Sequence, residues 1–145
     1  MLCSQKFLEG TSYKPLARIV HSAVVGVEPR IMGIGPVNAI KKVLAKTKLK
    51  LEDMDIIEIN EAFAVQVLAC MRELDISDND ERVNPNGGAI ALGHPLGMSG
   101  ARILLSAAHE LRRRKKRFAI VSMCIGVGQG YATLIENPFF SQSNK

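Results

Sequence analysis

The 145-residue sequence predicts an α/β domain with a mixed sheet, and three observations support this fold class. Short apolar segments rich in β-branched residues alternate with longer segments that carry apolar residues at helical spacing. The composition, 47% hydrophobic and 23% charged, is that of a chain that folds around a core. The last two apolar segments are separated only by a glycine-rich turn, which is typical of an antiparallel hairpin. The predicted order is β-α-β-α-loop-α-β-β, so part of the sheet should be parallel.

The first half of the chain supplies a short helix, two strands and two longer helices. The segment 17–27 shows little alternation of apolar and polar residues, which predicts a strand buried on both faces. Pro36 suits the first turn of the helix that follows. The helix stripe consists of Val37, Ile40, Val43 and Leu44. The remaining elements are a helix at 4–10, a strand at 55–60 and a helix at 61–74, with an apolar stripe of Phe63, Val67, Leu68, Met71 and Leu74.

The second half begins with a glycine-rich region at 84–100, which contains one brief apolar run. A helix follows over 99–116, and its aligned residues are Leu104, Ala107, Ala108 and Leu111. Strands are predicted at 117–124 and 131–136, and we expect them to pair as a hairpin.

Composition narrows the class of protein without naming its function. The net charge of +5 permits an anionic partner but does not require one. Three cysteines, an odd number, argue against a disulfide framework and favour a reducing compartment, so we expect a cytoplasmic location. We expect no membrane span, because no uncharged apolar run of sufficient length is present, and no signal peptide.

His94 is the first candidate for chemistry, because the residues around it are small or rigid. It lies between Gly93 and Pro95, and a helix begins a few residues later. A helix N-terminus favours an anion or a polarised carbonyl, and a positioned histidine is a common acid/base group. The alternative is a structural glycine-rich turn that carries an incidental histidine.

Cys124 and Asn60 each lie at the predicted end of a strand, where ligands bind in open α/β sheets. A thiol at that place can serve as acid, base or nucleophile, but Cys124 could equally be a small buried residue. Asn60 could polarise a carbonyl or orient a water, but asparagine is also a favoured helix N-cap. A shared cleft is expected only if Asn60, His94 and Cys124 meet at one edge of the sheet.

Three ordered segments resemble the thiolases, acetyl-CoA acyltransferases that cleave or form 3-ketoacyl-CoA. They are NEAFA at 60–64, NPNGGAIALGHPLGMSGAR at 84–102 and MCIGVGQGYATLIE at 123–136. The resemblance extends from Tyr13 to Glu136 and implies the C-terminal half of the thiolase fold, a mixed sheet of about four to five strands covered by helices on both faces. It implies that residues 1–12 are a remnant of the preceding half and that 13–145 form the C-terminal domain.

The sequence CIGVGQG at 124–130 is similar to the thiolase branch that handles 3-oxoadipyl-CoA. Many thiolases read CxGGGxG at this place, so Val127 departs from the wider pattern. We expect the departure to affect the preference for the acyl chain more than the type of reaction.

The resemblance also implies a role for each of four residues. His94 would deprotonate the nucleophilic cysteine and help bind the thioester oxygen, and Asn60 would hold a water in that first oxyanion site. Cys124 would be the general acid/base that protonates the departing acetyl-CoA enolate or removes an α-proton. The backbone N–H of Gly126 would form half of the second oxyanion hole. An enolate needs such a proton donor and such hydrogen-bond donors.

The nucleophilic cysteine of thiolases belongs to the N-terminal half, which this sequence does not resemble. Cys70 is predicted to be core, and Cys3 lies where the family has no catalytic residue. We therefore expect a truncated gene, an excised domain or one half of a split enzyme, inactive without its N-terminal half. CoA thioesters are expected as substrates, with no cofactor and no metal, and homo-oligomers are expected because an isolated half exposes apolar surface. The CoA-binding residues are unknown.

Two other functions remain as alternatives. One is a binding or scaffold protein that has kept the thiolase fold without its turnover. The other is nucleic-acid binding through the basic run RRRKKR at 112–117, which could contact phosphates. Basic residues at a helix C-terminus also complement its dipole, and no aromatic stacking set accompanies the run, so we expect neither a nucleic-acid nor a membrane partner.

Overall fold

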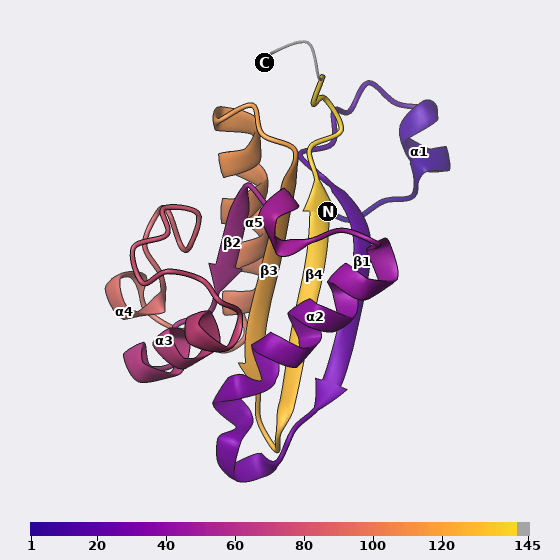
Figure 1. The fold of residues 1–145 in the computed structure, drawn as a ribbon. Coiled ribbons are helices and arrows are strands. Elements are labelled where there is room, and N and C mark those ends of the chain that lie inside the picture. The colour runs from indigo at the N-terminus through magenta and orange to yellow at the C-terminus, as the bar shows by residue number, and fades with distance from the viewer. Residues whose placement is uncertain (142–145) are drawn as a thin grey trace.

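The computed structural model describes residues 1–141 and contains four strands together with helices of very different lengths (Figure 1). In chain order the elements are α1 (Gln5–Glu9), β1 (Arg18–Gly26), η1 (Pro29–Ile34), α2 (Gly35–Thr47), η2 (Leu51–Asp53), β2 (Ile56–Ile59), α3 (Ala64–Glu73), α4 (Ala89–Leu92), α5 (Ser99–Arg113), β3 (Phe118–Ile125) and β4 (Gln129–Glu136).

The four strands form one mixed sheet in the order β1-β4-β3-β2. β4 pairs antiparallel with both β1 and β3, whereas β2 and β3 are parallel, with Ile59 opposite Ser122. This arrangement confirms the predicted mixed sheet and the predicted C-terminal hairpin. Because β2 and β3 are parallel, their carboxyl ends lie at the same edge of the sheet.

Helices cover both faces of the sheet, as predicted (Figure 1). α2 and α3 bury the larger apolar cluster on one face, to which Ile57, Ile59 and Ile120 contribute from the strands. α5 covers the other face and packs on Ile56, Ala119 and Val121. The predicted stripe of α2 is confirmed, since Val37, Ile40, Val43 and Leu44 are all buried. The spacing of these apolar residues therefore predicted this helix correctly.

The prediction that the segment 17–27 is buried on both faces is wrong. β1 lies at the edge of the sheet, and among its residues only Ala23 is buried. Ile19 and Val24 remain 44% and 47% exposed. The continuous apolar composition resembled that of a central parallel strand, but composition alone does not say how many neighbours a strand has.

The predicted helix at 61–74 begins later than expected. α3 begins at Ala64 with the extended Phe63 as its N-cap residue, so Asn60 does not cap it. Val67, Met71 and Leu74 are buried as predicted, whereas Phe63 is 67% exposed and Leu68 37% exposed. The segment between β2 and α3 is therefore a short irregular connection, and Asn60 is free for another role.

The brief apolar run inside the glycine-rich region forms α4, a single helical turn. None of the helices in the part of the chain described, residues 1–141, combines the length and apolarity needed to cross a membrane. Residues 142–145 of the predicted domain 13–145 lie outside the described residues.

Candidate active site

The candidate site lies at the carboxyl ends of β2 and β3, beside the N-terminus of α5. Asn60 follows β2 directly, and its backbone N–H donates to Ser122 O on β3 at 2.9 Å. Cys124 is two residues further along β3. His94 lies on the loop between α4 and α5. The three segments therefore meet at one edge of the sheet, which is the condition on which a shared cleft is expected.

Asn60 and His94 are in direct contact, and Ser99 completes the group. Asn60 Nδ2 lies 3.4 Å from His94 Nε2, and Ser99 Oγ lies 2.6 Å from His94 Nδ1. Ser99 Oγ also donates to Pro95 O at 3.1 Å. A hydroxyl has one proton, so Ser99 accepts from an Nδ1–H of His94. The Nε2 atom of the neutral ring is then a bare acceptor that faces the Asn60 amide, as a general base requires.

Asn60 is 1% exposed, so its amide is held by the fold and not by solvent. Its Nδ2 group faces His94, while its Oδ1 atom is buried without a hydrogen-bond partner among residues 1–141. A buried amide with a fixed N–H direction is a suitable donor to a polarised oxygen or to a water.

Cys124 is buried, with 8% of its surface exposed, and its burial raises the pKa of the thiol. At neutral pH the group is therefore a protonated thiol, which is the form that can donate a proton. No hydrogen bond joins Cys124 to Asn60 or His94 within the described part of the chain. The structure thus brings Asn60 and His94 together and places Cys124 on the neighbouring strand, with no hydrogen bond to either in residues 1–141.

Gly126 begins the loop that joins β3 to β4, and it is exposed. A Cβ atom built there would meet nothing within 4 Å, so packing does not require glycine at this position. Its N–H is not engaged by any backbone or side-chain acceptor of residues 1–141. Gly128 differs, because its φ of +86° and a hypothetical Cβ only 2.4 Å from Val27 O make it a structural glycine.

Glu61 is a site residue whose importance the sequence did not reveal. Its carboxylate accepts from Asn84 Nδ2 at 2.9 Å and from Ile90 N at 3.0 Å, so it ties the glycine-rich region to the end of β2. A Cβ on Gly88 would lie 2.1 Å from the Glu61 Cδ atom, which explains glycine there. The helix dipole does not explain Glu61, because α3 begins only at Ala64.

Ser99 is a second residue that sequence reasoning missed. It lies at the start of α5, and it is fully buried and hydrogen-bonded to the histidine ring. Its position five residues after His94, at the start of a helix, was the available signal.

The other two cysteines are placed as predicted. Cys70 is fully buried, its thiol donates to Gly33 O at 3.3 Å, and burial raises its pKa to about 11. Cys3 is exposed near the start of the chain. Neither cysteine lies beside His94. Among residues 1–141, no group of three or more histidine, cysteine or carboxylate side chains could hold a metal.

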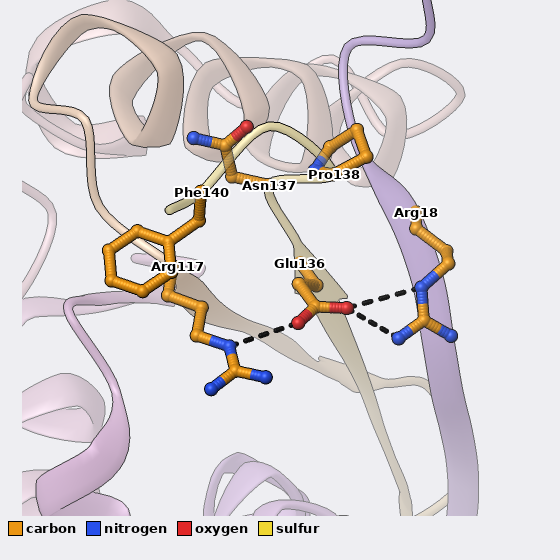
Figure 2. Close-up of a pocket in the computed structure, with 6 residues that line it drawn as sticks. All are labelled: Arg18, Arg117, Glu136, Asn137, Pro138 and Phe140. Atoms are coloured by element: carbon orange, nitrogen blue, oxygen red, sulfur yellow. Dashed lines mark hydrogen bonds and ion pairs between the residues drawn. The ribbon is translucent and has the colours of Figure 1, made fainter. Parts of the chain in front are cut away.

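Two surface hollows lie away from these residues. One, of about 310 Å³, surrounds Glu136, which forms ion pairs with Arg18 and Arg117 (Figure 2). The other, of about 470 Å³, lies along α5 beside Leu105 and His109. Neither hollow is lined by Asn60, His94 or Cys124.

The basic run at 112–117 is largely engaged within the chain. Arg113 and Arg114 both pair with Glu110, and Arg117 pairs with Glu136. Arg112 donates to Pro15 O at 3.2 Å and stacks on Phe139. These contacts give the run a structural explanation, while the absence of a nucleic-acid partner stays a prediction.

Comparison with known proteins agrees with the resemblance seen in the motifs. Residues 13–137 match the model of the thiolase C-terminal domain. The 3-oxoadipyl-CoA/3-oxo-5,6-dehydrosuberyl-CoA thiolase of Escherichia coli is 56% identical over 94% of this chain and 34% of its own length. The β-ketoadipyl-CoA thiolase of Pseudomonas aeruginosa is 54% identical with the same coverage. The chain thus spans about a third of the length of these relatives.

Solved structures give the same result for the fold. Human mitochondrial 3-ketoacyl-CoA thiolase, in a crystal structure with CoA, superimposes with a TM-score of 0.88 and 53% identity, over 92% of this chain and 33% of the human chain. The acetyl-CoA acetyltransferase of Bacillus anthracis gives a TM-score of 0.88 at 51% identity. Fold, sequence and the paired Asn60 and His94 therefore lead to one assignment: the chain belongs to the thiolase family and carries its C-terminal domain.

Proposed function

We propose that this chain supplies the acid/base half of a thiolase active site, for thiolytic cleavage of a 3-ketoacyl-CoA by CoA or for the reverse Claisen condensation. The observation that carries this proposal is the His94 ring, whose Nδ1–H is held by Ser99 and whose bare Nε2 faces the Asn60 amide. A neutral imidazole with a fixed tautomer can accept a proton from a thiol and then donate it to an oxyanion.

In cleavage, the Nε2 atom of His94 would take the proton of the nucleophilic cysteine. The thiolate would attack the 3-keto carbon, and the bond between C2 and C3 would break. The electron pair of that bond leaves as the enolate of acetyl-CoA, and the acyl group stays on the cysteine until the thiol of CoA removes it. The Asn60 amide would orient a water, and this water and the protonated ring of His94 would stabilise the oxyanion.

Cys124 would give its proton to C2 of the departing enolate, and in condensation its thiolate would remove a proton from the acetyl group. The raised pKa of this thiol favours the protonated form needed for cleavage. The free N–H of Gly126, two residues further on, is a suitable donor to the enolate oxygen.

The nucleophilic cysteine would come from a second half outside these 145 residues. Exposed apolar side chains follow each site residue along the chain: Phe63 is 67% exposed, Leu96 is 80% exposed and Val127 is 83% exposed. Apolar surface of this kind favours coverage by a second polypeptide segment, and it also supports our proposal of homo-oligomers.

For the substrate, we propose a 3-oxoadipyl-like CoA thioester, because relatives at 54–56% identity carry that activity in their names. CoA thioesters would be substrates, with no further cofactor. We also propose a cytoplasmic location, which the free thiols of Cys3, Cys70 and Cys124 support because such thiols persist in reducing compartments.

The test is complementation between two polypeptides. The 145-residue chain is mixed with the N-terminal two thirds of the Escherichia coli relative, and the loss of 3-oxoadipyl-CoA is followed after addition of CoA. We expect turnover from the mixture and not from either part alone, its loss with Cys124→Ala, and its retention with the exposed-site control Cys3→Ala. A stable complex without turnover would instead support the scaffold function.

A further inference from the structure

Two charged side chains are enclosed between β2 and α5, beneath the candidate site. Glu58 is 1% exposed and lies in β2, which is buried along its whole length. Arg102 lies in the first turn of α5, three residues after Ser99. Side chains alternate along a strand, so Glu58 and Asn60 share the face of β2 that Ile56 presents to α5.

Five buried polar atoms of Glu58, Asn60 and Arg102 lack hydrogen-bond partners within residues 1–141. On the strand side the unpartnered atoms are two acceptors, Glu58 Oε1 and Asn60 Oδ1. On the helix side they are the three guanidinium nitrogens of Arg102, which are all donors. Acceptors on one element thus face donors on the other, and all of them are shielded from bulk solvent.

Glu58 and Arg102 are close enough to interact electrostatically. The positive charge of Arg102 lowers the pKa of Glu58 and opposes the stronger effect of burial, which raises this pKa to about 7. No hydrogen bond or ion pair joins the two groups in the described chain. Buried polar groups without partners are costly, and internal water commonly bridges such groups by making about three hydrogen bonds.

We propose that ordered internal water bridges Glu58 and Arg102 into a buried charged pair that fastens the first turn of α5 to the end of β2. The Asn60 Oδ1 atom is a further acceptor for the same water. Glu58 and Arg102 are then positioning residues, because the turn that they fasten carries Ser99, and Ser99 holds the His94 ring. Their relevance to catalysis rests on the proposed role of His94, whereas the water bridge itself does not.

The first test is a high-resolution crystal structure of the 145-residue chain. We expect at least one ordered water within hydrogen-bond distance of both Glu58 Oε1 and a nitrogen of Arg102. Direct contact between the two side chains, or a dry gap, would overturn the proposal.

The second test is a double-mutant cycle with Glu58→Gln and Arg102→Met, followed by thermal unfolding. The charges that face Glu58 are those of Arg102, Glu61 and Glu110. At about pH 8, where Glu58 is ionised, Arg102→Met should lower the melting temperature, because it leaves a buried carboxylate without a counter-charge. Glu58→Gln removes the cost of burying that carboxylate and should not lower the melting temperature at this pH. In the Glu58→Gln background the loss caused by Arg102→Met should therefore be smaller, and at about pH 5, where Glu58 is neutral, this coupling should shrink. An equal loss from Arg102→Met in both backgrounds at both pH values would refute the charged pair.

The third test separates positioning from general stability by ¹⁵N NMR of the His94 ring. Arg102→Met should mix the two ring tautomers, whereas Arg102→Lys, which keeps the charge, should largely preserve one. The control is Gln66→Leu, since Gln66 also has a buried unpartnered oxygen but lies on α3, across the sheet. An unchanged tautomer in Arg102→Met would rule out the positioning role, whatever the complementation assay shows.

Discussion

Substitution of Ser99 by alanine tests the central element of the proposed site. Ser99→Ala removes the hydroxyl that accepts from His94 Nδ1 at 2.6 Å and donates to Pro95 O at 3.1 Å. Because Ser99 is fully buried, water does not readily replace the hydroxyl. The histidine ring should then lose the contact that selects its tautomer.

The size of the effect follows from the two lost hydrogen bonds. Each is worth about 1 kcal/mol, and a donor left without a partner adds to the loss, so we expect about 1–3 kcal/mol less stability. For a domain of this size that corresponds to a melting temperature lower by roughly 3–10 °C. Loss of one bond to Nδ1 weakens the tautomer preference by roughly tenfold.

The assay is ¹⁵N NMR of histidine-labelled protein, which distinguishes a protonated from a bare ring nitrogen. Wild type should show His94 with a bare Nε2, and Ser99→Ala should show a mixture. Ser106→Ala is the matched control, because it makes the same change two turns later in α5. If Ser99→Ala kept a single tautomer with a bare Nε2, the hydrogen-bond assignment at His94 would be refuted.

Three further predictions concern pH, glycine and thiol reactivity. Burial raises the pKa of Glu58 from 4.5 to about 7, so the stabilisation by the protonated side chain is complete below about pH 4.5 and is lost as the pH rises through 7. Urea unfolding should show that the free energy of unfolding falls by up to about 3 kcal/mol over this range, and Glu58→Gln should abolish the fall. Gly128→Ala should lower the melting temperature, because the φ of Gly128 is +86° and the new Cβ atom would clash with Val27 O. Gly126→Ala should change the melting temperature by no more than about 1 °C, and equal effects of the two variants would contradict this distinction. Iodoacetamide should modify the exposed Cys3 first and should reach Cys70, with its pKa of about 11, only on unfolding; mass spectrometry would reveal the opposite order.

The elements with strong periodicity were predictable from the sequence. The stripe of α2 and the hairpin of β3 and β4 agree with the expectation because local pattern and tertiary packing favour the same structure. β1 was misjudged because burial depends on its neighbours in the sheet, and an apolar segment does not show whether it will lie at an edge. The start of α3 was misplaced because Asn60 is a good N-cap in general, while here its side chain contacts His94.

The candidate residues of the site could be predicted from the sequence, but the residues that hold them in place could not. His94, Cys124 and Asn60 were identifiable from their places beside glycines and strand ends. Periodicity does not reveal the supporting residues. Glu61 contacts segments that are distant along the chain, and Ser99 and Arg102 lie in the first turn of α5. Glu58 did leave a signal, since a carboxylate between Ile57 and Ile59 interrupts a strand that is otherwise apolar.

The two sides of β2 differ, and this difference bears on how the site is assembled. Ile57 and Ile59 face the apolar cluster beneath α2 and α3, while Glu58 and Asn60 face α5. Asn60 and Ser99, the two residues whose hydrogen bonds reach the His94 ring within residues 1–141, belong to this chain, so the tautomer of His94 should be set before any second half binds. Addition of the N-terminal half of a relative should leave the ¹⁵N pattern of a bare Nε2 in place while turnover appears. A tautomer that formed only in the mixture would mean that the second half, and not Ser99, orients the base.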